Sequence, residues 1–372
     1  MSPRRRLLLV FCVLCSLCTA FSPPIMTDGD VPVRTLTPDQ LRDLQPPDKK
    51  PQITAAAAMV LNLNTGQIVY SLHPHERRAP ASLTKMVTAL VAVEDYATKN
   101  EMEAREMRVR QSDVAWTYSA VHISNGEPLN MWQLMNMLLI ASDNVAANVL
   151  ARELAGDRAT FVEWMNQRVQ EMGLQNTRFG NPSGLDHEAT YSTAYELAII
   201  ARAFISDPVL LDIVNTTEAT AAGHPIQSTN ELLGVYPGMV GVKTGTTDNA
   251  GECLITLVQR PEGEVMSVVL GSEERFKDTR RLLDYYYDNY AELRIALPPS
   301  DQNRYLDRDG NWHELAMDSE QVVLIRPWQV GSDTAYRYIT MRRSDPQPDE
   351  TVGILAVQLA GEPLMEVSLY AR

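Results

Sequence analysis

Three short groups of residues, far apart in the chain, carry side chains that together could perform covalent catalysis. The first is Ser82-Leu83-Thr84-Lys85, which opens an apolar segment with helical spacing, so Ser82 and Lys85 would share one helix face. A serine hydroxyl is a weak nucleophile, but a neighbouring amine kept neutral by burial can take its proton. A helix start also offers backbone N–H groups to a developing oxyanion. On its own the pair is weak, since about one chance match is expected in a chain of this length.

The second and third groups give this pair a context. Ser142-Asp143-Asn144 follows an apolar helical segment, and Lys243-Thr244-Gly245-Thr246 opens a β-rich segment. A second Ser-x-Asn group at 228–230 follows no apolar helix and lies close before Lys243, so we interpret it as a loop. The ordered set therefore combines a serine nucleophile, a candidate base, further hydroxyls and a second lysine.

This ordered set resembles the active-site serine penicillin-recognising enzymes. Within that superfamily the chain is similar to low-molecular-mass D-Ala-D-Ala carboxypeptidases over roughly residues 54–290, including Asn181-Pro182-Ser183-Gly184-Leu185. We interpret that last stretch as a turn shaping the cleft, because it offers no acid or base. The tail at 351–370 is similar to the end of the family's β-rich C-terminal domain.

The resemblance implies a role for each motif residue. Ser82 would attack the carbonyl of the penultimate D-Ala with Lys85 as general base, and the resulting acyl-enzyme would be released by water. Ser142 would relay protons between Lys85 and the leaving amine. Asn144 would hold the substrate amide and the lysine.

The third motif would bind the end of the substrate. Lys243 and Thr244 would receive the terminal carboxylate, and Gly245 would let the substrate strand approach closely. Backbone N–H groups of Ser82 and Thr246 would form the oxyanion hole. The implied partners are the peptidoglycan stem peptide and β-lactam antibiotics, which would acylate Ser82 and inactivate the enzyme. No cofactor is implied.

The elements that must position these groups can be predicted from hydrophobic spacing. Strands are expected at both ends of the first domain and helices between them, which predicts an α+β fold with one antiparallel sheet covered by helices. The resemblance implies that this is the β-lactamase/transpeptidase-like arrangement. The predicted strands are 57–63, 67–72, 253–259 and 265–270, and the predicted helices are 82–96, 131–140, 144–154, 160–172, 195–205 and 275–290.

Composition shifts divide the chain into four segments. Residues 1–20 are expected to be a signal peptide, because Arg4 to Arg6 precede a short apolar run and a small-x-small site. Residues 21–51 are proline-rich and are expected to be a tether. The peptidase domain is predicted at 52–297, and a small all-β domain at 298–372 follows a Pro-Pro boundary with strands at 321–326, 335–341, 352–359 and 364–370.

The signal predicts export, to the periplasm or the outer face of the bacterial cytoplasmic membrane. Peripheral association with the membrane or wall stays open, as does an uncleaved signal that anchors the protein.

The 33 Lys plus Arg against 47 Asp plus Glu give a net charge of −14, which disfavours nucleic-acid binding. Beyond the signal only Cys253 remains, so no internal disulfide is expected. The six histidines form no His-Glu-x-x-His signature, and we predict no metal site.

Three alternative functions remain open from the sequence. A β-lactamase is favoured by the Ser-Asp-Asn variant of the second motif, but class A enzymes carry a Glu and an Asn four apart that activate the deacylating water. Glu163 and Asn166 are three apart in a predicted helix, and Glu188 is interpreted as an exposed loop residue. An endopeptidase cutting cross-links is a close chemical neighbour of the carboxypeptidase. A non-catalytic wall-binding protein is disfavoured because every polar motif residue is present.

Overall fold

The computed structural model describes residues 49–94, 96, 98–298, 300, 303–340 and 350–371 of the chain. The described residues form two compact units, Lys49–Tyr290 and the part that begins at Ala291. The adjacent prolines at 298 and 299 had predicted the boundary between the two domains at 297/298. It falls earlier because the strand Ala291–Ile295 pairs with Gln321–Ile325 of the second unit. The predicted signal peptide and most of the predicted tether lie outside the described residues.

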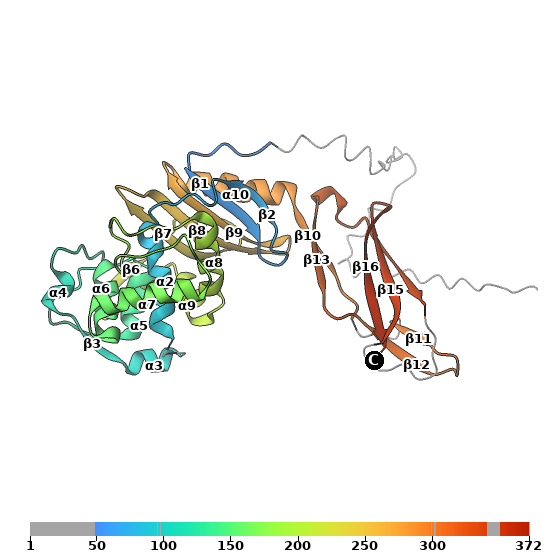
Figure 1. Ribbon diagram of the computed structural model, residues 1–372, viewed down its shortest axis with the longest axis horizontal. Helices are drawn as coiled ribbons and strands as arrows, with labels where there is room; N and C mark the ends of the chain where they lie inside the picture. Colours follow the sequence, from blue (N-terminus) through green and yellow to red (C-terminus); the bar gives the residue numbers. More distant parts are fainter. Residues whose placement is uncertain are drawn as a thin grey trace, which may run out of the picture. The chain divides into compact units, whose positions relative to one another are not determined.

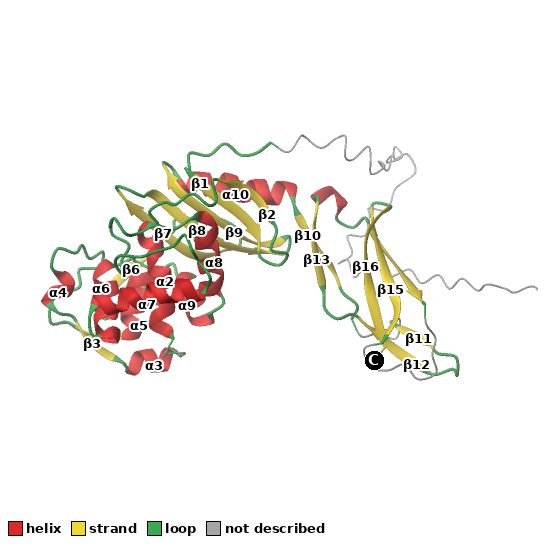
Figure 2. Ribbon diagram, in the orientation of Figure 1, coloured by secondary structure: helices red, strands yellow, loops and turns green. Residues whose placement is uncertain are grey.

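The first unit is built on a five-stranded antiparallel sheet in the order β2-β1-β9-β8-β7. The strands are β1 (Ala57–Asn62), β2 (Ile68–Leu72), β7 (Met239–Thr247), β8 (Gly251–Arg260) and β9 (Gly263–Ser272). Figures 1 and 2 show α10 (Arg275–Asn289) along one face and the remaining helices gathered beyond the other. Strands from the two ends of the unit thus meet in one sheet, and the predicted α+β fold is confirmed.

The helical part of this unit is inserted between β2 and β7. It contains the 3-10 helix η1 (Ala81–Thr84), α2 (Lys85–Val93), α3 (Lys99–Ala104), α4 (Gln111–Val114), α5 (Met131–Leu139), α6 (Asn144–Ala155), α7 (Arg158–Glu171), α8 (Ala194–Ile205) and α9 (Pro208–Val214). This part also contains two small two-stranded antiparallel sheets, β3 (Glu106–Arg108) with β4 (Pro128–Asn130) and β5 (Glu218–Ala221) with β6 (His224–Gln227).

Local sequence explains where several of these helices begin. Asp157 accepts from the backbone N–H groups of Ala159 and Thr160, at 2.8 and 3.0 Å, and so caps α7. Thr193 caps α8 in the same way, and Asp207 caps α9 with Pro208 at the first helical position. Hydrophobic spacing in the sequence predicted α7 and α8, but it did not predict the short helix α9.

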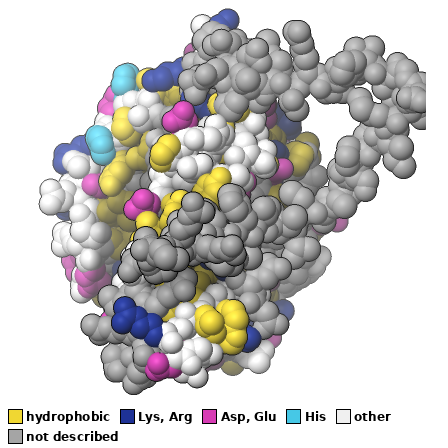
Figure 3. Space-filling view, turned by 90° about the vertical axis from the view of Figure 1, so that its right-hand side faces the viewer, with side chains coloured by type: hydrophobic (Ala, Val, Ile, Leu, Met, Phe, Trp, Pro, Cys, Tyr) yellow, Lys and Arg dark blue, Asp and Glu magenta, His cyan; other side chains and the backbone are white. Residues whose placement is uncertain are grey.

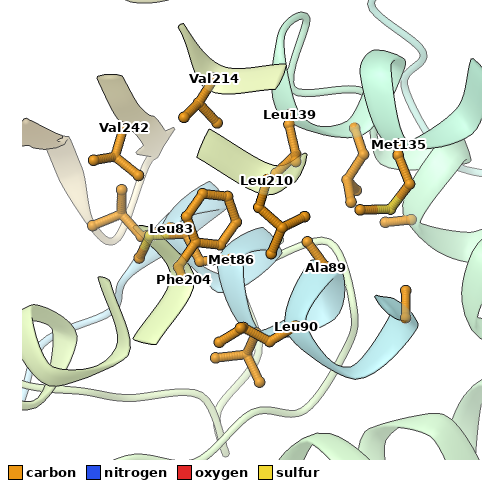
Figure 4. Packing of buried hydrophobic residues seen from close by; sticks show 14 of the residues in the cluster. Leu83, Met86, Ala89, Leu90, Met135, Leu139, Phe204, Leu210, Val214 and Val242 are labelled. Atoms are coloured by element: carbon orange, nitrogen blue, oxygen red, sulfur yellow. The ribbon is translucent and has the colours of Figure 1, made fainter. Parts of the chain in front are cut away.

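The core of the first unit surrounds α2, all nine residues of which are buried. A helix that is apolar on every side must lie inside the protein rather than on its surface. Figure 4 shows Leu83, Met86 and Leu90 packed among side chains such as Phe204 and Leu210. The central position of α2 places the start of this helix, with Ser82 and Lys85, against the sheet: η1 packs on β7.

In the described residues of the second unit, the regular secondary structure is β apart from one 3-10 turn, η2 (Pro327–Gln329). Its main sheet has the order β11-β12-β16-β15-β14, and β10 pairs with β13 separately. The strands are β10 (Ala291–Ile295), β11 (Arg304–Leu306), β12 (Trp312–Ala316), β13 (Gln321–Ile325), β14 (Asp333–Ile339), β15 (Thr351–Leu359) and β16 (Glu362–Ala371). The predicted all-β character of the tail is confirmed.

Two sequence predictions differ in detail from the structure. The helix predicted as one element over 82–96 begins as η1 and becomes α-helical only at Lys85. Hydrophobic periodicity does not distinguish a 3-10 turn from the first turn of an α-helix. Strand β7 was anticipated only as the start of a β-rich segment, because buried polar motif residues interrupt its apolar pattern. Within the described residues, no helix is both long and apolar enough to cross a membrane.

Candidate active site

Lys85 lies at the centre of the site with its amine beside the Ser82 hydroxyl. The side chain of Lys85 is completely buried, and its Nζ lies 2.8 Å from Ser82 Oγ. The same nitrogen donates to Asn144 Oδ1 at 2.8 Å and to the carbonyl oxygen of Ser183 at 2.6 Å. Those two oxygens can only accept, so in the neutral amine they take its two hydrogens. The lone pair is then left for the hydroxyl of Ser82.

Burial lowers the pKa of Lys85 from its ordinary value to about 7, and the nearby carboxylate of Asp143 raises it against that effect. At neutral pH a substantial share of this lysine is therefore the free amine. A free amine next to a serine hydroxyl can act as a general base. Burial thus gives Lys85 the lowered pKa that a general base needs at neutral pH, which the spacing of Ser82 and Lys85 in the sequence could not show.

Asp143 caps α6 and ties it to the preceding loop. Its Oδ1 accepts from Ala146 N at 2.9 Å, and its Oδ2 accepts from Ser119 Oγ at 2.6 Å and Val121 N at 3.2 Å. This cap fixes Asn144 at the first position of α6. Ser142, just before the cap, has φ of 59°, in the left-handed region that non-glycine residues rarely adopt. Such strain is commonly found where a fold holds a side chain in a functional position.

Ser142 contacts the second lysine of the site. Lys243 lies on β7, is buried, and donates from Nζ to Ser142 Oγ at 2.7 Å and to the Thr244 carbonyl oxygen at 3.1 Å. Burial lowers the pKa of Lys243 well below its ordinary value, and the positive charges of Lys85 and Arg275 lower it further. The structure therefore links Ser142 to Lys243, and it links Asn144 to Lys85.

Gly245 lies where β7 approaches the start of the nucleophile helix. A Cβ at this position would lie 2.9 Å from the backbone nitrogen of Ser82 and 3.1 Å from the carbonyl oxygen of Pro80. Any side chain here would crowd the Ser82 N–H, so glycine keeps that donor accessible. Thr246 follows on the same strand and is exposed.

Two residues that the sequence did not mark as functional, Arg275 and Thr229, contact the β7 residues of the site. Arg275 donates from Nη1 to the Gly245 carbonyl oxygen at 3.0 Å and also contacts Thr246 Oγ1. Thr229 shares a hydroxyl contact with Thr244. The segment 228–230 is a loop, as predicted, but it lies at the site. No local pattern marks either residue, since both reach the site only through tertiary contacts.

The Asn181–Leu185 stretch is a turn that packs directly beneath the nucleophile. Asn181 Oδ1 accepts from the backbone N–H groups of Ser183 and Gly184, at 3.2 and 2.7 Å, and holds the turn. Gly184 has φ of +82°, and a Cβ there would lie 2.0 Å from the Ala81 carbonyl oxygen. The turn thereby presents the Ser183 carbonyl to Lys85. Our prediction that it shapes the cleft was incomplete, because its backbone also orients the lysine.

The remaining candidates from the sequence lie apart from these contacts. Glu163 is exposed on α7, and Glu188 is exposed in its loop. Among the residues that the structure describes, no group of His, Cys, Asp and Glu side chains could hold a metal ion. On the face drawn in Figure 3, Lys and Arg side chains are interspersed with Asp and Glu. Within the site, the positive charges that act on Lys243 are those of Lys85 and Arg275.

The fold and the paired serines and lysines define this protein as one of the penicillin-recognising active-site serine enzymes. More closely, the chain belongs to the peptidase S11 family, described as D-alanyl-D-alanine carboxypeptidase, whose sequence profile matches residues 45–274. It is 31% identical over 244 residues to the D-alanyl-D-alanine carboxypeptidase DacF of Bacillus subtilis, a match covering 63% of each chain. That match therefore spans less than two thirds of this relative.

Two further comparisons bear on the function and on the fold. A D-alanyl-D-alanine endopeptidase of Escherichia coli is 29% identical over 245 residues, covering 63% of this chain and 77% of that protein. The crystal structure of penicillin binding protein 6B from Escherichia coli matches with a TM-score of 0.69 at 24% identity. It covers 87% of this chain and 96% of that chain, so the similarity in fold extends into the β-rich tail.

Proposed function

We propose that the protein is a serine-type D-Ala-D-Ala carboxypeptidase that removes the terminal D-Ala from peptidoglycan stem peptides. The observation that carries this proposal is the buried Lys85 amine, 2.8 Å from Ser82 Oγ and with its pKa lowered to about 7. Membership of a family described by this activity supports the substrate. The enzyme would act outside the cytoplasm, where its substrate lies.

In acylation, Ser82 Oγ attacks the carbonyl carbon of the penultimate D-Ala while its proton passes to Lys85. The tetrahedral oxyanion is stabilised by the backbone N–H groups of Ser82 and Thr246. The C–N bond then breaks, and the leaving amine takes a proton from the Ser142 hydroxyl, which recovers one from protonated Lys85. Because Lys243 donates to Ser142 Oγ, the hydroxyl hydrogen of Ser142 is free to point toward the amine.

Deacylation returns the enzyme to its starting state. Water attacks the ester carbonyl and gives a proton to Lys85, and the Ser82 oxygen leaves after taking that proton back. Asn144 would hold the acyl-side amide in both steps, whereas Lys243 and Thr244 would bind the terminal carboxylate only until the terminal D-Ala leaves in acylation. Gly245 provides room for the substrate backbone beside Ser82.

The test is to replace the nucleophile. Ser82→Ala should abolish D-Ala release and covalent labelling by a fluorescent penicillin, because loss of a catalytic nucleophile commonly costs several orders of magnitude in rate. Mass spectrometry of a stem peptide ending in D-Ala-D-Ala should show loss of one D-Ala with the unaltered protein only. Labelling that persists in the Ser82→Ala variant would refute the assignment.

An endopeptidase is the second candidate, because a relative with that name is 29% identical over 63% of this chain. Cross-linked peptide dimers separate the two, since an endopeptidase would cut them into monomers. A β-lactamase would need a base for deacylation, and Glu163 and Glu188 are both exposed outside the contacts of the site. A penicillin adduct that persists in intact-mass measurements would support the carboxypeptidase over the β-lactamase.

A further inference from the structure

Two large aromatic side chains stand exposed on a loop beside the site. Trp116 is fully exposed, at 103% of its reference area, and Tyr118 is 72% exposed. Exposing a tryptophan costs the free energy that its burial would have provided, so a rigidly held and exposed aromatic pair calls for an explanation.

This loop is held firmly on both sides of the pair. Asn148 donates from Nδ2 to the Asp113 carbonyl oxygen at 3.0 Å and to Thr117 Oγ1 at 3.2 Å. Ser119 donates to Asp143 Oδ2 at 2.6 Å. The backbone is therefore anchored, and the exposure of the two rings is a property of the fold.

The backbone at Trp116 is also strained. Its φ is 60°, in the left-handed region that bulky residues rarely adopt, and glycine would occupy this position at lower cost. Strain at a non-glycine residue commonly marks a place where function outweighs stability. Here the strain occurs at the most exposed aromatic residue of the loop.

The loop contacts the acyl side of the site, which is the side that would hold the part of the substrate that becomes bonded to Ser82. The Tyr118 carbonyl oxygen accepts from Asn144 Nδ2 at 3.2 Å, and the other end of that amide, Oδ1, accepts from Lys85. The carboxylate side, with Lys243 and Thr244, belongs to β7. A peptide running from β7 past Ser82 to Asn144 would therefore bring its preceding residue next to Tyr118.

We propose that Trp116 and Tyr118 form an aromatic rim that binds the aliphatic side chain of the stem-peptide residue preceding the two D-Ala residues. Aromatic rings bury methylene groups well and order few rotatable bonds in doing so. The inference rests on the proposed function, and it assigns a specificity determinant on the acyl side.

The test uses two synthetic peptides, acetyl-norleucyl-D-Ala-D-Ala and acetyl-glycyl-D-Ala-D-Ala. Replacing both aromatics with Ala should lower kcat/KM for the norleucyl peptide about tenfold, which corresponds to the burial of one to two methylene groups. The glycyl peptide should change far less, because it has no side chain to lose. Trp164→Ala is the matched control, since this tryptophan is half-exposed on α7 and packs on Phe161.

A second variant separates binding from folding. Trp116→Gly should raise the melting temperature by relieving the strain, while the preference for the norleucyl peptide falls. A loss of equal size for both peptides, or no loss, would overturn the aromatic rim. A loss of kcat/KM seen only with substrates that carry sugar would also overturn the proposal, because the two rings would then bind glycan rather than the peptide side chain. If the unaltered protein released no D-Ala from either peptide, the proposed function itself would fail.

Discussion

The two buried lysines of the site both contact a serine hydroxyl and both have a pKa lowered by burial, but they differ in their other partners and in the charges around them. Lys85 has three oxygen neighbours, two of which can only accept, and a carboxylate nearby at Asp143. The described contacts of Lys243 are two oxygens, and the charged groups that act on it, Lys85 and Arg275, are cations. The Lys85 amine thus has three hydrogen-bond partners within the protein, whereas the Lys243 amine can still donate one more hydrogen bond when it is protonated.

This difference shows how one site can use the same residue type for two tasks. The neighbours of Lys85 orient its lone pair toward Ser82 and bring its pKa to about 7, the range suited to a base at neutral pH. The neighbours of Lys243 make its charged form unfavourable until an anion arrives. A carboxylate ligand would supply the missing negative charge. We therefore expect Lys85 to move protons and Lys243 to bind anions.

The largest expected effect comes from replacing each lysine with arginine. Lys85→Arg should reduce the rate of acylation by penicillin at least ~100-fold, because a guanidinium does not give up its proton and cannot act as a base. Lys243→Arg keeps the charge that an anion site requires, and its loss should be clearly smaller. Stopped-flow labelling measures both rates, and thermal unfolding verifies that both variants fold. Equal losses would remove the distinction between the two lysines.

The next effect concerns the pH at which Lys85 becomes active. Because the neutral amine is the base, the acylation rate should rise with pH through about 7. Asp143 raises the pKa of Lys85, so Asp143→Asn should lower that pKa and move the acid limb of the profile to lower pH. Asp157→Asn is the control, since it removes the charge of a helix cap on α7 instead. A profile that moves equally in both variants would contradict the electrostatic role of Asp143.

The smallest effect is a proton taken up when a carboxylate ligand binds. In the ligand-free site the pKa of Lys243 is well below its ordinary value, and a bound carboxylate should raise it, so binding should draw up to one proton from solution. Calorimetry of penicillin binding to the Ser82→Ala variant, in buffers of different ionisation enthalpy, measures this uptake. The uptake should vanish when Lys243→Met is added. A binding heat independent of buffer would show that Lys243 is already charged.

Much of this protein could be predicted from local sequence patterns. The α+β fold followed from hydrophobic spacing and from strands at both ends of the unit, and the motif residues stood out by type and order. The residues that cap helix starts, such as Asp157 and Thr193, bind backbone N–H groups two or three residues further along the chain. A pattern that acts over so short a distance can be interpreted without knowledge of the fold.

The spacing of Ser82 and Lys85 predicted that these two side chains would meet, but the tertiary structure decided how the other groups of the site pair. The Ser183 carbonyl reaches Lys85 across 98 positions of sequence, and Ser142 reaches Lys243 across 101. Arg275 and Thr229 joined the site in the same way, without any motif of their own. The lowered pKa values of both lysines arise from desolvation, which depends on what surrounds a side chain and not on its neighbours along the chain. The sequence determined which chemical groups were present, and folding determined which lysine meets which serine and with what charge.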